Sequence, residues 1–237
     1  MSQPSRTYIP AAGQDWALAL YDPIAKLLGG DAAKRKLLDQ VSMLPGHHVL
    51  DIGCGTGTLV IHIKQLYPDV DVVGLDPDPK ALARARRKAA RASVSIQFDQ
   101  GFADALPYPD ASIDCVLSSF MFHHLPGDDK EAMLREVRRV LKPVGTLNLL
   151  DFDGPDAGAD GFLMRLPPLR HHLKDNSAGR ILGLMQQAGF AGAKNVRQAT
   201  ILFGSLRLNY YQAALTSPEM VSTPIQEMAF PPRNISK

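Results

Sequence analysis

The sequence has few of the features that mark secreted or membrane-spanning proteins. Among 237 residues there are only two cysteines, Cys54 and Cys115, and each lies in an apolar segment. That placement is typical of small buried side chains in a reducing compartment rather than of a disulfide framework. There is no run of 18 apolar residues, and the first 16 residues lack the apolar stretch of a signal peptide. We therefore expect a cytoplasmic protein without a membrane span.

The chain also lacks a strong charge of either sign. Its formal net charge is +2, which is too small to indicate nucleic acid or an anionic membrane as the main partner. Six Lys and Arg residues fall between Lys80 and Arg91, and we interpret them as the solvated face of a helix. Hydrophobic residues make up 45% of the chain, enough for the core of one domain with additions.

Apolar strand-like segments alternate with helix-like segments through the first two thirds of the chain. Strands joined by helices indicate crossover connections, and hence a parallel sheet that is covered on both faces. The expected strands are 48–53, 71–76, 94–100, 113–120 and 146–152, and the expected helices are 31–44, 58–67, 79–92 and 129–143. Beyond these we expect a helix at 178–190 and an antiparallel pair of strands at 194–203 and 205–215.

The stretch "VLDIGCGTGTL" at 49–59 places Gly53, Gly55 and Gly57 directly after the first strand. Ligands of open α/β sheets bind at this end of the strands, and glycines there let a ligand lie against the backbone. A tight structural turn is the alternative interpretation. The third glycine of a dinucleotide-binding fingerprint is replaced by Thr58, and the lysine of a P-loop is missing. Asp76 ends the second strand, where an acid suits the hydroxyls of a ribose.

"VLDIGCGTG" followed by "VVGLDPD" resembles the class I S-adenosylmethionine-dependent methyltransferases. The chain is most similar to their small-molecule group, known as type 11 or as ubiquinone/menaquinone biosynthesis methyltransferases. "LPYPDASIDCVLSSFMFHHL", "LREVRRVLKPVGTLNLLDF" and "LMQQAGF" fit later parts of the same pattern. The resemblance covers about 45–152. It implies a Rossmann-like, doubly wound, mostly parallel sheet of seven strands, with helices on both faces and the last strands antiparallel.

The resemblance also implies a division of the chain. Residues 1–44 form an N-terminal helical cap, and 45–215 form the S-adenosylmethionine-binding domain. Within that domain 152–178 is an insert and a candidate substrate lid, and 216–237 form an extended tail.

In the resemblance, the glycine loop holds the methionine end of S-adenosylmethionine, whose product is S-adenosylhomocysteine, and Asp76 holds the ribose. Phe102 stands where the family usually has an aspartate near the adenine, so we expect its ring to cover the adenine instead. The backbone amide of Ala103 is then placed to reach a ring nitrogen. The full set of predicted cofactor contacts is Tyr21, Asp51, Gly53, Cys54, Gly55, Gly57, Asp76, Pro77, Phe102, Ala103, Ser118 and Ser119.

Two adjacent histidines, His123 and His124, follow the fourth strand. The family usually carries a histidine that matches His124, which implies a base or orienting group near the methyl acceptor. A structural histidine is the alternative. We expect no metal site, because the sequence has no cluster of Asp, Glu or Cys at metal-ligand spacing. The predicted catalytic residues are therefore His124 and His123.

The resemblance implies methyl transfer to oxygen or carbon of a small molecule by in-line displacement. Segments 7–30 and 152–178 are rich in aromatic and apolar residues, so we expect an apolar or aromatic acceptor. "SSFMFHH" replaces the Asn/Asp-Pro-Pro-Tyr-like motif of nucleic-acid amino methylases, which argues against a nucleic-acid acceptor. The alternatives are a module that binds S-adenosylmethionine without catalysis and a nicotinamide oxidoreductase. The oxidoreductase is disfavoured by the glycine spacing and by the missing Tyr-x-x-x-Lys pair. A homodimer remains open.

Overall fold

The computed structural model describes residues 29–155, 173–190, 192–202 and 204–215. Most of the predicted N-terminal cap, most of the 152–178 insert, Tyr21 and the tail at 216–237 lie outside these ranges. The predicted domain boundaries therefore stay predictions. Among the helices of the described ranges, none has the length and apolar character needed to cross a bilayer.

A single sheet of seven strands forms the centre of the molecule, in the order β3-β2-β1-β4-β5-β7-β6. The five strands from β3 to β5 in this order pair in parallel, and β7 runs antiparallel to both of its neighbours. This confirms the predicted mostly parallel sheet with antiparallel last strands. The strands are β1 (His48–Ile52), β2 (Asp71–Asp76), β3 (Gln97–Gln100), β4 (Ile113–Ser119), β5 (Leu141–Phe152), β6 (Lys194–Ile201) and β7 (Leu206–Ala214).

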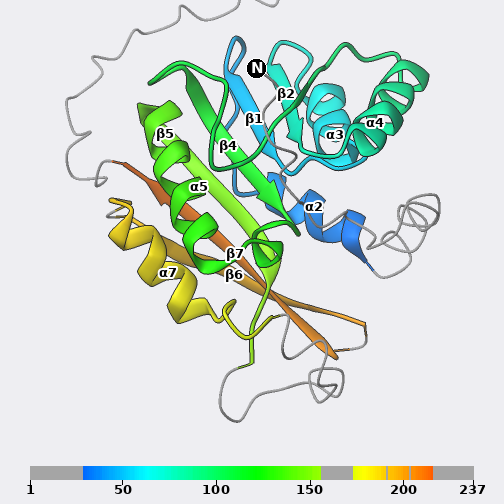
Figure 1. Ribbon diagram of the computed structural model, residues 1–237. Helices are drawn as coiled ribbons and strands as arrows, with labels where there is room; N and C mark the ends of the chain where they lie inside the picture. The colour runs from blue at the N-terminus through cyan, green and yellow to red at the C-terminus, as the bar shows by residue number, and fades with distance from the viewer. Residues whose placement is uncertain (1–28, 156–172, 191, 203, 216–237) are drawn as a thin grey trace, which may run out of the picture.

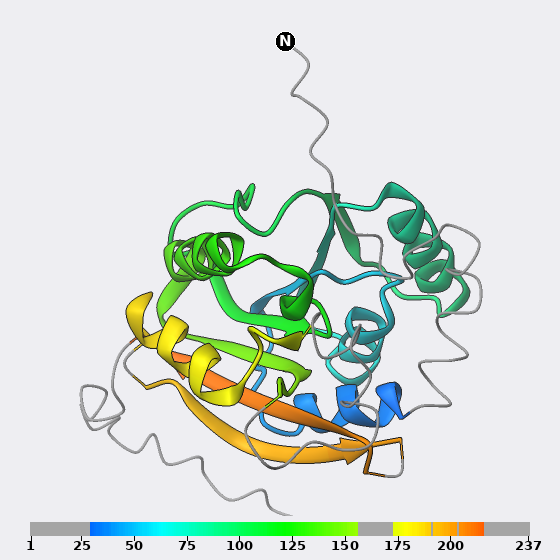
Figure 2. The ribbon, with the colours of Figure 1, turned by 60° about the horizontal axis from the view of Figure 1, so that its bottom comes forward.

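Helices cover both faces of the sheet (Figures 1 and 2). Successive side chains of a strand point to opposite faces, so a strand buried on both sides is apolar throughout. Val49 of β1 joins one core cluster, and Leu50 joins the other. The first cluster packs under α2 (Gly30–Leu38), α3 (Thr58–Leu66) and α4 (Pro79–Arg91), and the second under α5 (Gly127–Val140) and α7 (Ala178–Gln187).

Helix α2 ends six residues earlier than the predicted 31–44, because tertiary hydrogen bonds replace helical ones. The side chain of Gln40 donates to the carbonyl of Tyr211 (3.2 Å), and the carbonyl of Gln40 accepts from the side chain of Gln212 (3.0 Å). These bonds fix the chain against β7. Buried backbone groups need such partners wherever a helix stops.

Two other predicted boundaries shift for similar reasons. The predicted helix at 129–143 begins at Gly127 and ends at Val140, because Leu141 already pairs with Ile113 in the sheet. The predicted strand at 94–100 begins at Gln97. Residues before it close helix α4 instead: Ser93 has a φ of 55°, and the amide of Val94 donates to the carbonyl of Ala89 (3.1 Å).

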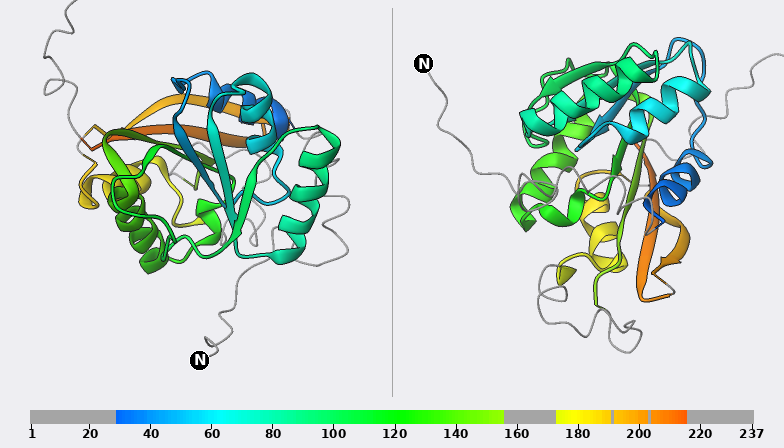
Figure 3. Two further views of the ribbon diagram at one scale, coloured as in Figure 1. Left: turned by 90° about the horizontal axis from the view of Figure 1, so that it is seen from above. Right: turned by 90° about the vertical axis from the view of Figure 1, so that its right-hand side faces the viewer.

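The strand order reverses between β1 and β4, since the chain passes outward from β1 to β3 and then returns to β4. At such a switch point the connections leave the sheet in opposite directions, and a crevice opens at the carboxyl ends of the strands. Figure 3 shows helices on both sides of the sheet in two further views. The fold thus places the glycine loop, Asp76 and the two histidines at one edge.

Candidate active site

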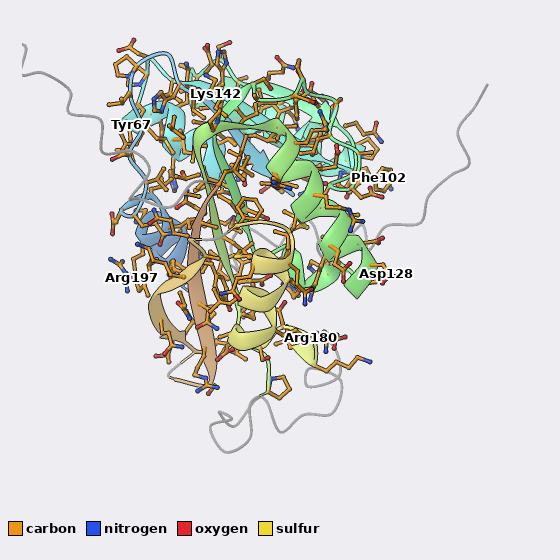
Figure 4. The ribbon with its side chains drawn as sticks, turned by 90° about the vertical axis from the view of Figure 1, so that its left-hand side faces the viewer. Tyr67, Phe102, Asp128, Lys142, Arg180 and Arg197 are labelled. Carbon is orange, nitrogen blue, oxygen red and sulfur yellow. The ribbon has the colours of Figure 1, made fainter. Side chains whose placement is uncertain are left out.

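A cavity of about 250 Å³ lies at the carboxyl ends of β1, β2, β3 and β4. Figure 4 shows Phe102, after β3, and Asp128, at the start of α5, on the same side of the molecule, opposite Tyr67. The lining residues are Lys34, Ile52, Gly53, Cys54, Gly55, Thr56, Leu75, Asp76, Pro77, Asp78, Gly101, Phe102, Ala103, Ser119, Phe120, Met121, His124, Leu125, Pro126 and Asp129.

The three glycines of the loop have positive φ values of 73°, 55° and 77°, a region that side chains disfavour. A Cβ on Gly53 would collide with the side chain of Met121, and one on Gly57 would lie 2.9 Å from the Cβ of Ala85. A Cβ on Gly55 would meet nothing within 4 Å. Gly53 and Gly57 are therefore explained by packing, whereas Gly55 opens onto the cavity and leaves room for a ligand.

Asp76 ties the glycine loop to the end of β2. Its carboxylate accepts hydrogen bonds from the amides of Gly55 (2.8 Å) and Asp78 (2.9 Å). Burial raises the pKa of Asp76, and these two hydrogen bonds oppose that shift. A carboxylate offers about four acceptor positions, so room for ligand hydroxyls remains. Asp78 caps α4 by accepting from the amide of Lys80 (2.8 Å), as its position before Pro79 suggests.

Asp51 lies behind the loop with 1% of its surface exposed. Neither of its carboxylate oxygens has a hydrogen-bond partner among the described residues. Burial raises the pKa of Asp51 to about 7, against the opposing effect of Lys34. A buried acid without a hydrogen-bond donor suits a cationic or donating ligand group, such as the amino group of a methionine moiety. The residues around the cavity therefore fit S-adenosylmethionine.

Most of the predicted cofactor contacts line the cavity. Those that do are Gly53, Cys54, Gly55, Asp76, Pro77, Phe102, Ala103 and Ser119. Asp51, Gly57 and Ser118 are not lining residues, and the hydroxyl of Ser118 donates to the carbonyl of Ile52 (3.0 Å). Neighbouring residues of a strand face opposite ways, so only one of the two serines faces the cavity. Among the described residues there is no group of three or more potential metal ligands.

The two histidines have different surroundings. His124 lines the cavity, whereas His123 does not. The Nδ1 atom of His123 lies 2.6 Å from Oδ1 of Asp151, at the end of β5. The Asp151 carboxylate is fully buried, and it also accepts from the backbone amides of His123 and Phe152, both at 2.7 Å. The imidazole rings of His123 and His124 lie 4.1 Å apart between centroids.

This hydrogen bond determines which nitrogen of His123 carries the hydrogen. An ionised carboxylate only accepts, so Nδ1 of His123 donates to Asp151, and Nε2 of the neutral ring keeps its lone pair. A carboxylate in this position also stabilises the imidazolium that forms when Nε2 takes a proton. The pair is therefore suited to act as a base.

Sequence reasoning missed several residues at this edge, of which Asp151 is the most important. The sequence did carry a sign of it, because Asp151 is the next to last residue of an apolar strand and Asp76 is the last residue of another. Phe120 lines the cavity with a φ of 57°, a strained backbone conformation of the kind that gathers at functional sites. Lys34 and Met121 also line the cavity, and nothing in the sequence marked them.

Comparison with known proteins agrees with this site. Residues 49–145 match the methyltransferase domain family. A demethylmenaquinone methyltransferase of Deinococcus radiodurans is 44% identical over 118 residues, which cover 50% of this chain and 48% of that protein. A demethylmenaquinone methyltransferase of Thermus thermophilus is 38% identical over 149 residues, covering 62% of this chain and 67% of that protein. The chain thus spans between about half and two thirds of these relatives.

The fold has solved counterparts as well. The phosphoethanolamine N-methyltransferase 2 of Haemonchus contortus, solved with phosphomonomethylethanolamine and S-adenosylhomocysteine, superposes with a TM-score of 0.72. It is 16% identical and covers 86% of this chain and 58% of its own, so this likeness shows the fold alone. Together these findings establish that the chain belongs to the class I S-adenosylmethionine-dependent methyltransferase family. Within that family it belongs to the UbiE-like group, which takes its name from relatives described as ubiquinone/menaquinone biosynthesis C-methyltransferases.

Proposed function

We propose that this chain transfers a methyl group from S-adenosylmethionine to a quinone-related small molecule with an ionisable hydroxyl. The family and the names of its relatives support the reaction class. The observation that carries the proposal is the buried pair of His123 and Asp151 beside the cavity. The choice between oxygen and carbon as the acceptor atom is left open, since deprotonating a phenol-type hydroxyl activates both its oxygen and its ring carbons.

The residues that would hold the cofactor follow from the cavity. Asp76 would accept from the ribose hydroxyls, and the open space over Gly55 would admit the chain of the ligand. Phe102 and Ala103 would contact the adenine. When bound, S-adenosylmethionine supplies a methyl group on a positively charged sulfur, which is electrophilic without further activation.

The chain's own part in the reaction is then alignment, exclusion of water and removal of a proton. Holding two reactants in line is worth about 7–11 kcal/mol. Nε2 of His123 takes the proton from the acceptor hydroxyl, and Asp151 stabilises the imidazolium. His124 lines the cavity next to the His123 ring and limits where the acceptor lies. In this proposal His124, which the sequence favoured as the catalytic residue, forms part of the cavity lining. His123 acts as the base.

Two matched variants test this assignment with a short-chain demethylmenaquinone, reduced with dithionite, as the acceptor. Formation of S-adenosylhomocysteine is followed by mass spectrometry. His123→Asn is expected to lower kcat by about 10²–10⁴ and to leave cofactor binding within a factor of a few. His124→Asn is expected to change KM for the acceptor more than kcat. If His124→Asn alone abolishes turnover, the roles are reversed.

The remaining alternative is a module that binds S-adenosylmethionine without transferring its methyl group. Calorimetric binding of the cofactor without S-adenosylhomocysteine formation, across hydroquinone and phenol acceptors, would establish that alternative.

We also propose a cytoplasmic location. The two cysteines are free and buried, which suits a reducing compartment.

A further inference from the structure

Lys130 of α5 lies in the interior of the protein. Only 2% of its surface is exposed, and it shares a helix face with Met133, Leu134 and Val137, which are also buried. The spacing i, i+3, i+4, i+7 is that of a core-facing stripe. Lysine is almost never fully buried unless it is paired, so the ammonium group at this position requires an explanation.

The Lys130 ammonium has polar and aromatic partners. Its Nζ donates to Oδ1 of Asn176 (3.1 Å) and to the carbonyl of Asp175 (3.3 Å). It also lies 5.2 Å from the centroid of the Phe122 ring. The pKa of Lys130 is lowered, because burial outweighs the opposing effect of the negative charges of Asp151 and Asp175. These partners and acids favour a charged lysine in spite of its burial.

Hydrogen bonds on either side of the Phe152 backbone link this ammonium to the histidine. Asn176, which accepts from Lys130, donates its own amide hydrogen to the carbonyl of Phe152. The amide of Phe152 donates to Oδ1 of Asp151 (2.7 Å), and that same oxygen accepts from Nδ1 of His123 (2.6 Å). Since the Cα of Phe152 lies between that carbonyl and that amide, this link fixes the position of the backbone next to Asp151.

We propose that Lys130 is a positioning residue for the pair of His123 and Asp151. Its buried positive charge balances the Asp151 carboxylate, and the link through Asn176 holds that carboxylate in the orientation that His123 needs. This role rests on the proposed methyl transfer, in which His123 is the base.

Two further ion pairs involve residues close in sequence to Asn176 and Asp151. Arg180 pairs with Asp175 (3.2 Å), and Arg207 pairs with Asp153 (3.2 Å). The negative charge of Asp151 acts on Lys130, so this lysine can balance it. The titratable and charged groups on η1 (Phe122–His124), β5, the start of α5 and the segments next to them include, besides Lys130, Asp151, His124, Asp128, Asp129, Asp175, Arg180, Asp153 and Arg207.

The test is an NMR titration of the His123 imidazole in the purified protein without ligand. In Lys130→Met the Asp151 charge is no longer balanced, which favours the imidazolium, so the titration midpoint is expected to rise by about one pH unit. The matched control is Lys142→Met. Lys142 lies near the start of β5 and pairs with Asp114 (2.8 Å), so its loss is expected to leave the midpoint unchanged.

An unchanged midpoint in folded Lys130→Met would overturn the proposal, and so would an equal rise in Lys142→Met. Lys130→Arg keeps the charge and is expected to restore the wild-type midpoint. Should Lys130→Met not fold, Lys130→Gln removes the charge but keeps a donor for Asn176, and the same rise is expected. Should that variant also fail, Asn176→Ala breaks the link, and an unchanged midpoint there counts against the role.

This titration is independent of methyl transfer, so two failures can be told apart. If the short-chain demethylmenaquinone is not methylated but the midpoint rises as expected, the proposed function fails and the link from Lys130 to His123 stands. If the enzyme is active and the midpoint does not move, Lys130 has no such role. In an active enzyme, the acidic limb of the kcat profile is expected to move with the midpoint in Lys130→Met, whereas a purely structural defect would lower kcat at all pH values.

Discussion

At the residue scale, three glycines that look equivalent in the sequence have different tasks. Gly53 and Gly57 leave room for Met121 and Ala85, two side chains of the protein itself. Gly55 leaves room at the cavity, where the described residues place nothing. The interpretation as a structural turn therefore applies to Gly53 and Gly57, and the interpretation as a ligand-binding loop applies to Gly55.

Alanine substitutions separate these tasks. Gly55→Ala, Gly57→Ala and Gly46→Ala all place a side chain at positive φ, which costs about 1–2 kcal/mol. Gly46 is an exposed turn residue with nothing near its Cβ, so its variant measures that cost alone. We expect Gly55→Ala to unfold in urea like Gly46→Ala yet to lose most affinity for S-adenosylhomocysteine. Gly57→Ala is expected to be less stable than both. Full affinity in Gly55→Ala would show that this position does not contact the cofactor.

The buried carboxyl of Asp51 is expected to make the stability of the protein depend on pH. Its pKa is raised by burial to about 7 from an ordinary 3.8, so the ligand-free folded state holds a proton that the unfolded state releases. The stability that this group contributes is present below about pH 4 and is lost as pH rises toward 7. Relative to wild type, Asp51→Asn should therefore gain roughly 1.4 kcal/mol per pH unit between pH 4 and 7, and no more above that.

Urea unfolding at several pH values measures this gain in the absence of cofactor. The control is Asp69→Asn, which replaces an exposed aspartate and should run parallel to wild type. A stability difference that does not change with pH would contradict the raised pKa of Asp51.

At the scale of elements, one residue of α5 fixes the connection between β3 and β4. The Arg139 guanidinium donates to the carbonyls of Leu106 and Tyr108 and to the carboxylates of Asp110 and Glu136, all within 2.7–2.9 Å. This connection begins with the cavity residues that follow β3. Arg139 of α5 therefore holds in place the connection whose first residues line the cavity.

Arg139→Met should lower the free energy of unfolding by about 1–3 kcal/mol, since several charge-assisted hydrogen bonds are lost. Arg135→Met is the matched control, because Arg135 lies one turn earlier, is 65% exposed and pairs with Glu131 at 3.7 Å. An exposed pair of that kind is worth at most about 1 kcal/mol. Equal urea midpoints for the two variants would contradict the role of Arg139.

The hydrogen bond from Arg139 lowers the pKa of Glu136. The stability lost in Arg139→Met should therefore become smaller as pH falls below about 4, where Glu136 takes up a proton.

At the scale of the whole molecule, the cavity joins the two halves of the sheet. Gly55 and Asp76 come from the β1–β3 half, and Ser119 and His124 follow β4 on the other side of the switch point. A ligand that contacts both halves stabilises the folded state of the entire domain. At a hundred times its dissociation constant the gain is about 2.7 kcal/mol.

For a chain of this length that gain corresponds to a rise in Tm of about 5–10 °C with S-adenosylhomocysteine. Asp76→Ala is expected to lose most of the rise, because binding weakens by about 1.5–3 kcal/mol when ligand hydroxyls lose their acceptor. Ser118→Ala is the control variant, because the hydroxyl of Ser118 donates to the carbonyl of Ile52 rather than facing the cavity. This variant should have a lower Tm without ligand but show the full rise in Tm with S-adenosylhomocysteine. Loss of the rise in Ser118→Ala would place that serine at the ligand after all.

The sequence by itself determined the alternation of strands and helices, and with it the parallel sheet, the glycine loop and the position of Asp76. These follow from local periodicity and from chain connectivity, which confine such features to the carboxyl ends of parallel strands. The helix ends at Leu38 and Val140 were not predictable, because hydrogen bonds to β7 and pairing with β4 override local helix preference.

Only the tertiary structure decided which charged groups meet. His123 and Asp151 are 28 residues apart, and Lys130 and Asn176 are 46 apart. The sequence shows a histidine pair, an aspartate after a strand and a lysine in the phase of a buried helix face, but not their distances. Contacts of this range depend on how neighbouring strands are paired and how α5 is seated on them, and a shift of one residue in that register would turn each side chain to the opposite face.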